Sequence, residues 1–474
     1  MKTLRNISPT AEQLTLITLP RPGVRIIRGA AGSGKTTTSI LMMTVSIGYL
    51  SDYYKARDPH HKINAIVFGF NKTLTGYVRN LIDDSTKDYN DTKPNILVST
   101  LSKYFYDKIP SNKYDIISPN EDRYKELIRS LSLNIPLTLD FIIDEIEYLM
   151  GKLPPSDYES YIDIERVGRG NKPRVDKTLR RKILDEIIYP YMKFKSEKNI
   201  IDWNDIAIYL SKNKVDDIDI VVIDEAQDFS ANQLRAVLNQ CSETAFITIV
   251  LDGAQKIYNR GFTWNEVGIK NASYARLERN YRNTYEIADF ALSLLNASNI
   301  SYDEDSTLPN IKEISRHGEK PFLIEGSFPN QIDWIINFIK KNVDLKNQTV
   351  GFLHPKGYGW FKFLEGQLTA HGLDYEMISR NDNIMDNGIN IALSTIHSAK
   401  GLEFDFVFII GIEDRHFIFG EPDAEDSNYP TTLKLLAMAI TRARELAVIT
   451  YKNETKPAFL NLFDPKTYNL IKVY

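Results

Sequence analysis

The sequence predicts an α/β protein with two domains, each built on a parallel β-sheet, and a mostly helical insertion in the first domain. Short apolar runs rich in β-branched residues alternate with segments of helical periodicity along most of the 474 residues. Such strands, each followed by a helix, are typical of parallel sheets covered on both faces. With 43% hydrophobic residues, a chain of this length also has enough material for about two to four folded units.

Five apolar runs predict the sheet of the first domain. They lie at residues 24–29, 63–70, 95–100, 218–225 and 246–252. Each is bounded by polar or glycine-containing turns and is followed by a helix-like pattern, which is the order that a parallel sheet requires. We therefore assign residues 1–103 and 202–272 to this domain.

A second series of runs predicts the sheet of the second domain, at residues 320–326, 348–355, 389–395, 405–411 and 446–451. Between the first two of these runs, the sequence FPNQIDWIINFIKK places four isoleucines on one helical face: Ile332, Ile335, Ile336 and Ile339. We assign residues 273–474 to the second domain.

Residues 104–201 differ from both series, because they contain long charged and aliphatic segments and few strand-like runs. We expect a mostly helical insertion here. Its middle part carries a run of basic side chains: Arg166, Arg169, Lys172, Arg174, Lys177, Arg180, Arg181 and Lys182. A solvated helix face and a track for a phosphate backbone are both consistent with this run.

Composition excludes several classes of protein. The formal net charge is −4 and the isoelectric point is near 6.1, so the chain lacks the basic excess of proteins that capture nucleic acid by bulk charge. A single cysteine, Cys241, excludes disulfide frameworks, zinc ribbons and cysteine-ligated iron–sulfur clusters. The amino terminus has no signal-peptide pattern, and no run of about 18 apolar residues occurs. We expect a cytoplasmic protein without membrane attachment.

The sequence RGAAGSGKTTT, at residues 28–38, matches the phosphate-binding pattern G-x-x-x-x-G-K-[ST] after a predicted strand. In such loops backbone N–H groups hold phosphate oxygens, the lysine neutralises the β and γ phosphates, and the threonine hydroxyl binds Mg²⁺. ATP and Mg²⁺ are therefore the expected cofactors. Kinases, GTPases, transporters and motors share this pattern. Its nucleotide-binding residues are Gly29, Ala30, Ala31, Gly32, Ser33, Gly34, Lys35, Thr36 and Thr37.

Two acids follow the apolar strand in IDIVVIDEAQD, at Asp224 and Glu225. Asp224 can hold Mg²⁺ through water, and Glu225 can orient and deprotonate an attacking water molecule. A pair of acids in this place could instead cap a helix. Their position after a strand of the same domain favours the catalytic interpretation.

Several further motifs follow in order. DEAQD, VLDGAQKIY, LERNYRNT, STIHSAKGLEF and AMAITRAR, with SPTAEQ near the amino terminus, resemble the ordered motif set of the UvrD/Rep-type superfamily 1 helicases. The resemblance runs from the amino terminus to Arg444. It implies two RecA-like P-loop NTPase domains that bind ATP between them, and a DNA-dependent ATPase that acts as a helicase.

The resemblance also implies individual nucleotide contacts. These are Gln13 at the adenine edge, Tyr281 on the adenine face, and Gly401 and Glu403 at the ribose and phosphates. Gln255 resembles the residue that senses the γ phosphate and couples it to the strand-binding groove. Arg282 and Arg442 resemble the two arginines that reach the γ phosphate from the second domain. The catalytic set implied is Lys35, Glu225, Gln255, Arg282 and Arg442, with Thr36 and Asp224 at the metal.

For DNA, the resemblance points to Asn71, Lys72, Thr100, Ser102, Tyr258, Trp264, Thr395 and His397. A single strand needs backbone contacts and aromatic platforms, each stacked base contributing about 1–3 kcal/mol. Tyr258, Trp264 and Phe70 are candidate platforms. Each of these aromatic side chains could equally pack in a core.

The sequence departs from the family pattern in several places. Residues 379–388 alone separate two β units where larger members carry a long insertion, so the second accessory (2B) subdomain is missing. Thr37 stands where familiar members have an arginine that packs over adenine. A shift in YNRGFTW puts the base-stacking position of Trp264 in doubt. About 30 residues follow Arg444, too few for a nuclease domain with its own core.

The leading hypothesis is an ATP-dependent translocase or helicase on single-stranded DNA, alone or as the tail of a duplex, moving 3′ to 5′. A second hypothesis is a nucleotide-gated subunit that regulates a separate nuclease or effector partner without unwinding DNA. An RNA motor stays open as well, because contacts to the backbone do not readily distinguish the sugars. The pathway, the partner and the oligomeric state do not follow from the sequence.

Overall fold

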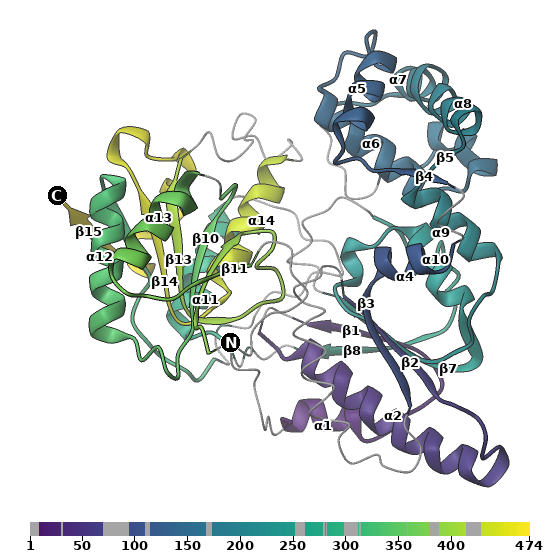
Figure 1. Ribbon diagram of the computed structural model, residues 1–474, viewed down its shortest axis with the longest axis horizontal. Coiled ribbons are helices and arrows are strands. Elements are labelled where there is room, and N and C mark those ends of the chain that lie inside the picture. The colour runs from purple at the N-terminus through teal and green to yellow at the C-terminus, as the bar shows by residue number, and fades with distance from the viewer. Residues whose placement is uncertain are drawn as a thin grey trace.

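The computed structural model of the protein describes residues 9–29, 32–69, 94–109, 114–166, 173–251, 261–277, 280, 282–297, 311, 314–357, 359–378, 388–413 and 428–474. Two lobes, each built on one β-sheet, lie side by side, and a group of helices lies at the end of one of them (Figure 1). We call these parts the first lobe, which holds the six-stranded sheet, the second lobe, which holds the seven-stranded sheet, and the insertion.

The sheet of the first lobe has the strand order β3-β2-β6-β7-β1-β8, and its pairings are parallel. The five strands that the sequence predicts are present. Strand β6 is buried along its whole length, which explains its continuous apolar run. The strands are β1 (Gly23–Gly29), β2 (Asn64–Gly69), β3 (Asn95–Thr100), β6 (Ile218–Ile223), β7 (Cys241–Leu251) and β8 (Ala272–Leu277).

Helices cover both faces of this sheet. One face carries α1 (Ala11–Ile17) and α2 (Lys35–Arg57), and the other carries α4 (Leu101–Asp107), α9 (Trp203–Lys212) and α10 (Ala231–Asn239). The core under α4 includes Tyr104 and Phe105. The first lobe therefore extends past residue 103, where we had expected the insertion to begin.

Strand β8 also moves a boundary. It pairs with β1, with Val24 opposite Ala272, so the first sheet continues to Leu277 and beyond the limit expected at residue 272. This strand lies at the sheet edge, and Leu277 is its one buried residue. An edge strand with so little buried surface has no continuous apolar run, which is why the pattern did not predict it.

The insertion consists mostly of helices packed around a core of its own. A short parallel pair of strands, β4 (Asp115–Ile117) and β5 (Ile200–Asp202), lies on the side near the first lobe (Figure 1). The helices are α5 (Asp122–Leu131), α6 (Leu139–Lys152), the 3₁₀ segment η2 (Pro155–Ile162), α7 (Lys177–Lys182), the π-helical segment η3 (Ile183–Ile188) and α8 (Tyr189–Lys198).

Basic side chains of the insertion bind groups within the insertion itself. Arg166 donates to both carboxylate oxygens of the buried Glu145, at 2.9 and 2.7 Å. Arg180 donates to four backbone carbonyl groups, and Arg181 donates to Glu159. These bonds occupy the guanidinium groups within the insertion, which does not favour a phosphate track. Arg169 and Lys172 lie outside the described residues.

The sheet of the second lobe has the order β11-β12-β10-β13-β14-β9-β15, again with parallel pairings. The five predicted strands are present, and two strands at opposite edges of the sheet were not predicted. β11 has three residues, and β15 exposes most of its side chains, so neither has an apolar run. The strands are β9 (Phe322–Gly326), β10 (Val350–His354), β11 (Glu376–Ile378), β12 (Ile391–Thr395), β13 (Phe404–Ile412), β14 (Ala443–Tyr451) and β15 (Asn469–Val473).

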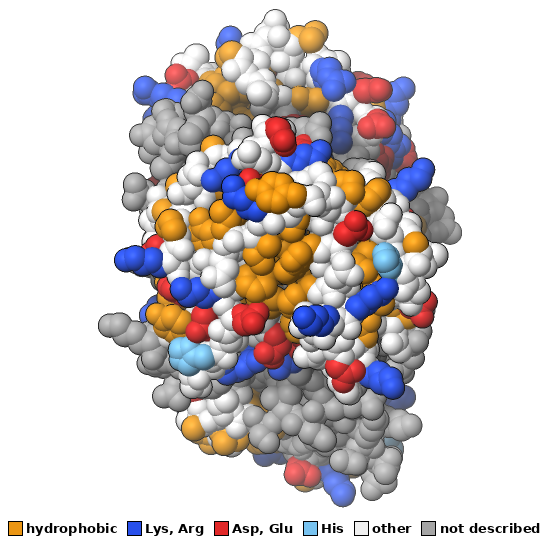
Figure 2. Space-filling model, turned by 90° about the vertical axis from the view of Figure 1, so that its left-hand side faces the viewer, with side chains coloured by type: hydrophobic (Ala, Val, Ile, Leu, Met, Phe, Trp, Pro, Cys, Tyr) orange, Lys and Arg blue, Asp and Glu red, His pale blue; other side chains and the backbone are white. Residues whose placement is uncertain are grey.

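This sheet too is covered on both faces. One face carries α11 (Tyr285–Ala297) and α14 (Asn428–Ile440), and the other carries α12 (Phe328–Asn342) and α13 (Gly359–Ala370). The predicted isoleucine face of α12 is confirmed, because all four side chains are at most 1% exposed. Figure 2 looks onto the side of this lobe and shows hydrophobic side chains gathered at its centre among scattered charges.

Two further observations concern the expected architecture. Strand β11 ends at Ile378 and β12 begins at Ile391, so the interval between them is too short for another folded subdomain. In the part of the chain that the structure describes, no helix is long and apolar enough to cross a membrane.

Candidate nucleotide-binding cleft

The loop between β1 and α2 forms one wall of a cleft. It turns tightly because Gly32 and Gly34 have φ angles of 78° and 75°, which residues with a side chain rarely adopt. A Cβ atom at Gly32 would lie 2.3 Å from Oδ1 of Asn280. A Cβ atom at Gly34 would lie 2.5 Å from Nε2 of Gln13, which also donates to the Ser33 carbonyl at 3.2 Å. The positive φ angles and the close neighbours at these two positions therefore both favour glycine.

Lys35 and Thr36 begin α2 and lie near Asp224, which follows β6. Lys35 Nζ donates to the carbonyl of Gly29 at 2.8 Å, and Thr36 Oγ1 donates to Asp224 Oδ2 at 2.8 Å. Burial and the adjacent Glu225 carboxylate raise the pKa of Asp224. The hydroxyl and carboxylate oxygens fit Mg²⁺, which prefers oxygen ligands and usually keeps water and phosphate in its remaining positions. A bound cation would favour the ionised carboxylate.

Glu225 reaches the cleft from an unusual backbone conformation. Its φ of 54° lies in the left-handed region, which costs about 1–3 kcal/mol for a residue with a side chain and is found often at functional sites. Gln227 Nε2 donates to Glu225 Oε2, and Lys400 Nζ lies 3.4 Å from the same oxygen. Burial alone would raise the pKa of Glu225, but Lys400, Lys35 and Arg442 lower it. These three cationic groups therefore favour the ionised carboxylate, which is the form that a general base requires.

Arginines form the opposite wall. Arg282 pairs with Glu403, and the buried guanidinium of Arg442 donates to the carbonyls of Met438 at 3.1 Å and Leu402 at 3.4 Å. Burial would raise the pKa of Glu403, but Arg282 and Arg442 outweigh it and lower the pKa. The second-lobe wall thus presents two guanidinium groups and one carboxylate, which leaves a positive excess for a phosphate.

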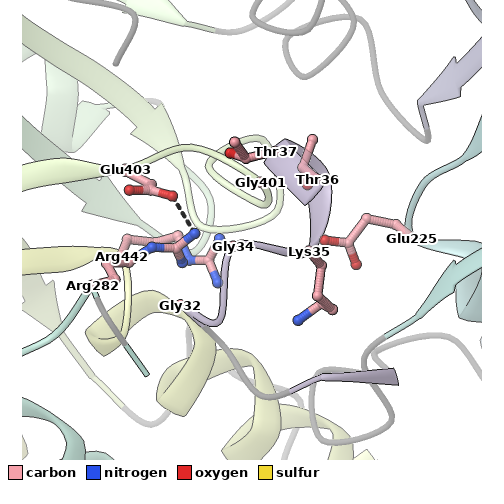
Figure 3. A pocket seen from close by; sticks show the side chains of 10 residues that line it. All are labelled: Gly32, Gly34, Lys35, Thr36, Thr37, Glu225, Arg282, Gly401, Glu403 and Arg442. Carbon is pink, nitrogen blue, oxygen red and sulfur yellow. Dashed lines mark hydrogen bonds and ion pairs between the residues drawn. The ribbon is translucent and has the colours of Figure 1, made fainter. Parts of the chain in front are cut away.

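The two walls enclose about 470 Å³ of empty space, part of it open to solvent. In Figure 3, Arg282, Arg442 and Glu403 lie on one side of the glycine loop, and Lys35 and Glu225 lie on the other. All of the lining residues belong to the set that the sequence predicts at the nucleotide. They are Gly32, Gly34, Lys35, Thr36, Thr37, Glu225, Arg282, Gly401, Glu403 and Arg442.

Family models match the chain in two places. The model of the UvrD/REP helicase N-terminal domain matches residues 74–273, and that of the UvrD-like helicase C-terminal domain matches residues 368–454. The chain belongs to the UvrD/Rep helicase family. The first match lies in the first lobe with its insertion, and the second lies in the second lobe.

Individual relatives match over shorter stretches. The ATP-dependent DNA helicase Rep of Buchnera aphidicola subsp. Baizongia pistaciae is 33% identical over 120 residues, which are 25% of this chain and 16% of that protein. The ATP-dependent DNA helicase PcrA of Staphylococcus epidermidis is 37% identical over 99 residues, 20% of this chain and 13% of that protein. The matched part is therefore less than a fifth of either relative. The C-terminal domain of a possible DNA helicase from Lactobacillus plantarum WCFS1 has a TM-score of 0.30 and 20% identity, with 40% of this chain and 98% of that chain covered.

In this UvrD/Rep family member, expected DNA contacts lie where strands end. Thr100 ends β3 and caps α4 by accepting from the Lys103 N–H at 3.3 Å, and the nearby Ser102 is exposed. Thr395 ends β12, and the exposed His397 follows it. Although the residue is exposed, the surrounding protein partly desolvates the His397 ring. This desolvation and the nearby Lys400 ammonium group lower the pKa of His397. A lowered pKa favours the neutral imidazole, which suits a hydrogen bond better than an ion pair.

The structure favours a packing role for Trp264. Its ring is half-buried against the first-lobe core and meets Phe262 edge to face, with ring centroids 5.6 Å apart. This contact agrees with the core interpretation of the aromatic more than with a base platform. Other predicted contacts lie outside the described residues: Ala30, Ala31, Phe70, Asn71, Lys72, Gln255, Tyr258 and Tyr281.

Some residues of the cleft have no role in the sequence interpretation. Lys400 and Gln227 both contact Glu225, and Asn280 lies against Gly32 and accepts from the Arg282 N–H at 2.9 Å. All three lie inside motifs that the sequence shows, STIHSAKGLEF, DEAQD and LERNYRNT. The motifs therefore contained the signal, but the contact of each residue depends on the fold.

Proposed function

We propose that the protein is an ATP- and Mg²⁺-dependent motor that moves along single-stranded DNA and displaces the strand paired with it, in the 3′ to 5′ direction implied by its resemblance to UvrD and Rep. The observation that supports this most is the cleft with two walls. Lys35 and Glu225 come from the first lobe, and Glu403 and Arg442 come from the second. A ligand that contacts both lobes can change their spacing when it is hydrolysed.

The first lobe would bind Mg²⁺-ATP and activate the attacking water molecule. When bound, Mg²⁺-ATP supplies a terminal phosphate bond whose cleavage is strongly favourable. The loop N–H groups at the start of α2 hold phosphate oxygens, and Lys35 neutralises their charge. Thr36 and Asp224 would hold the Mg²⁺, because their oxygens already lie together. Glu225 orients the attacking water and takes its proton.

The second lobe would stabilise the charge that develops in the transition state. Negative charge spreads over the γ-phosphate oxygens, and a well-placed arginine can contribute about 10³–10⁵ in rate. Arg282 and Arg442 line the cleft from this side, and Glu403 fixes Arg282 by an ion pair. Closure of the two lobes brings these groups to the γ phosphate. Loss of the γ phosphate removes the interaction that favours the closed arrangement.

The DNA strand would cross the carboxyl ends of both sheets. Thr100 of the first lobe and Thr395 of the second lobe end strands β3 and β12. Each lobe therefore offers its own backbone contact. Changes in lobe spacing would then change the distance between two contacts along one strand, which is the basis of stepwise movement.

The test combines turnover with strand displacement. We expect single-stranded DNA at low salt to raise kcat for ATP hydrolysis, and Lys35→Ala to abolish turnover in a folded protein. We also expect displacement from a duplex with a 3′ tail and not from one with a 5′ tail. Absence of any stimulation by DNA would contradict the motor, and hydrolysis without displacement would contradict unwinding. Salt must be held fixed, because phosphate contacts weaken steeply as it rises.

A further inference from the structure

Lys400 crosses from the second lobe into the first. It lies in the turn between β12 and β13, and its Nζ atom pairs with Asp228 and lies 3.4 Å from Oε2 of Glu225. Asp228 and Glu225 both belong to the turn that follows β6, where the Asp228 N–H donates to the Glu225 carbonyl at 3.0 Å. One ammonium group of the second lobe thus sits between two carboxylates of the first.

The three charged groups of this contact are buried, so separating them would be unfavourable. Lys400 is 2% exposed, Asp228 is not exposed, and Glu225 is 8% exposed. A buried charge without its partner is strongly unfavourable, whereas a paired one is tolerated when the geometry is good. The ammonium and the two carboxylates must therefore move together, or else water must enter when the lobes separate.

The turn around Lys400 is itself firmly held. The Ala399 N–H donates to the Thr395 carbonyl at 3.0 Å, and the Lys400 N–H donates to the His397 carbonyl at 3.3 Å. The side chains of Ile396 and Ala399 are fully buried in the second-lobe core. A displacement at Thr395 or His397 is therefore passed to Lys400 without being absorbed by a flexible loop.

We infer that Lys400 is a positioning residue that links the strand-contacting turn of the second lobe to the catalytic carboxylate Glu225 of the first. The inference rests on the proposed motor function, because it gives Thr395 and His397 a DNA contact. DNA bound at this turn fixes the place of Lys400, and Lys400 with Asp228 then fixes Glu225 for attack by water. Lys400 itself touches neither reacting atom.

A static connection between the lobes would make a different prediction. If the ion pair only held the lobes together, its loss would lower the melting temperature and reduce basal and DNA-stimulated turnover by the same factor. If Lys400 couples the DNA-contacting turn to Glu225, replacing it should lower mainly the DNA-stimulated kcat. The ratio of the stimulated to the basal kcat therefore separates the two roles.

The experiment uses the full chain with oligo(dT) as the strand. We compare the wild type with Lys400→Met, Asp228→Asn and Lys400→Arg, measuring basal and stimulated kcat, KM for ATP, oligo(dT) affinity and melting temperature. Lys452→Met is the matched control, because it removes a lysine that pairs with Glu413 inside the second lobe. A misplacement of about 1 Å can cost about 100-fold. We therefore expect Lys400→Met to lower the stimulated kcat by about 10–100-fold and to leave KM for ATP within about threefold.

The remaining variants give the outcomes that decide. Asp228→Asn, which keeps the volume of the side chain, should reduce the stimulation ratio in the same way even if Lys400→Met does not fold. Lys400→Arg, which keeps the charge, should recover part of the ratio, and Lys452→Met should keep all of it. A folded Lys400→Met or Asp228→Asn protein with the wild-type ratio would overturn the inference. A wild-type protein that DNA does not stimulate would overturn the motor function itself.

Discussion

Replacing Arg442 with alanine should slow ATP turnover by about 10³-fold at saturating single-stranded DNA. Arg442 is 2% exposed, and the carbonyls of Met438 and Leu402 hold its guanidinium in the wall of the cleft. An arginine that stabilises γ-phosphate charge contributes about 10³–10⁵ in rate, and we expect the lower limit because Arg282 remains. A factor of 10³ corresponds to a barrier higher by about 4 kcal/mol.

The same change should also lower stability, and the two effects must be measured apart. Hydrogen bonds made by a charged group contribute about 1.5–3 kcal/mol each, and Arg442→Ala loses those to two carbonyl groups. Steady-state kcat is therefore measured at a temperature well below the melting temperature of the variant, which circular dichroism provides. Binding of a fluorescent ATP analogue then separates loss of catalysis from loss of affinity.

Arg444→Ala is the matched control. It removes the same side chain two positions along the chain, where the side chain is 33% exposed and Nη1 lies 4.0 Å from Oδ1 of Asp405. We expect this variant to keep kcat close to that of the wild type. If folded Arg442→Ala protein kept a normal kcat, the assignment of the second-lobe wall to the γ phosphate would be wrong.

Three other changes test separate parts of the structure. Glu225→Gln should keep ATP binding and lower kcat by about 10²–10⁴-fold, because the water loses its proton acceptor; loss of binding in a ligand titration would contradict this. Gly34→Ala should weaken ATP binding and lower the melting temperature, because the φ of 75° at this position disfavours a side chain and the new methyl group would meet Gln13 Nε2. An unchanged ATP affinity together with an unchanged melting temperature would argue against a fixed loop. His397→Gln should leave the affinity for oligo(dT) unchanged at pH 7.5 and weaken it relative to the wild type only at acidic pH. The reason is that desolvation lowers the pKa of His397, so the positive charge forms only below that pKa. A difference in affinity that is constant with pH would contradict this expectation.

The sequence was sufficient for those elements whose burial is continuous. Strand β6 gave a strong pattern because every one of its positions is buried. Helix α12 gave one because its isoleucine face lies in a core. Edge strands gave none. β8 has one buried residue and β15 has none, so their place in the sheets depends on backbone pairing with β1 and β9, which residue patterns do not encode.

The candidate site shows the same division. Neighbouring residues of one motif, such as Lys35 and Thr36, were predictable because their spacing along the chain sets their geometry. Contacts between motifs were not, and the pairing of Lys400 with Asp228 joins positions 172 residues apart. Trp264 shows the opposite difficulty, because an aromatic side chain in a recognised motif gives no sign of whether it faces solvent or the core.

The chain passes from the first sheet to the second lobe within a few residues, since β8 ends at Leu277 and α11 begins at Tyr285. Even fully extended, residues 278–284 span at most about 25 Å. Arg282 lies on this connection, so the polypeptide that joins the two halves also carries a charge of their shared pocket. This short connection limits how far the two lobes can separate, and lengthening it with inserted glycines should weaken the coupling between phosphate binding and lobe spacing.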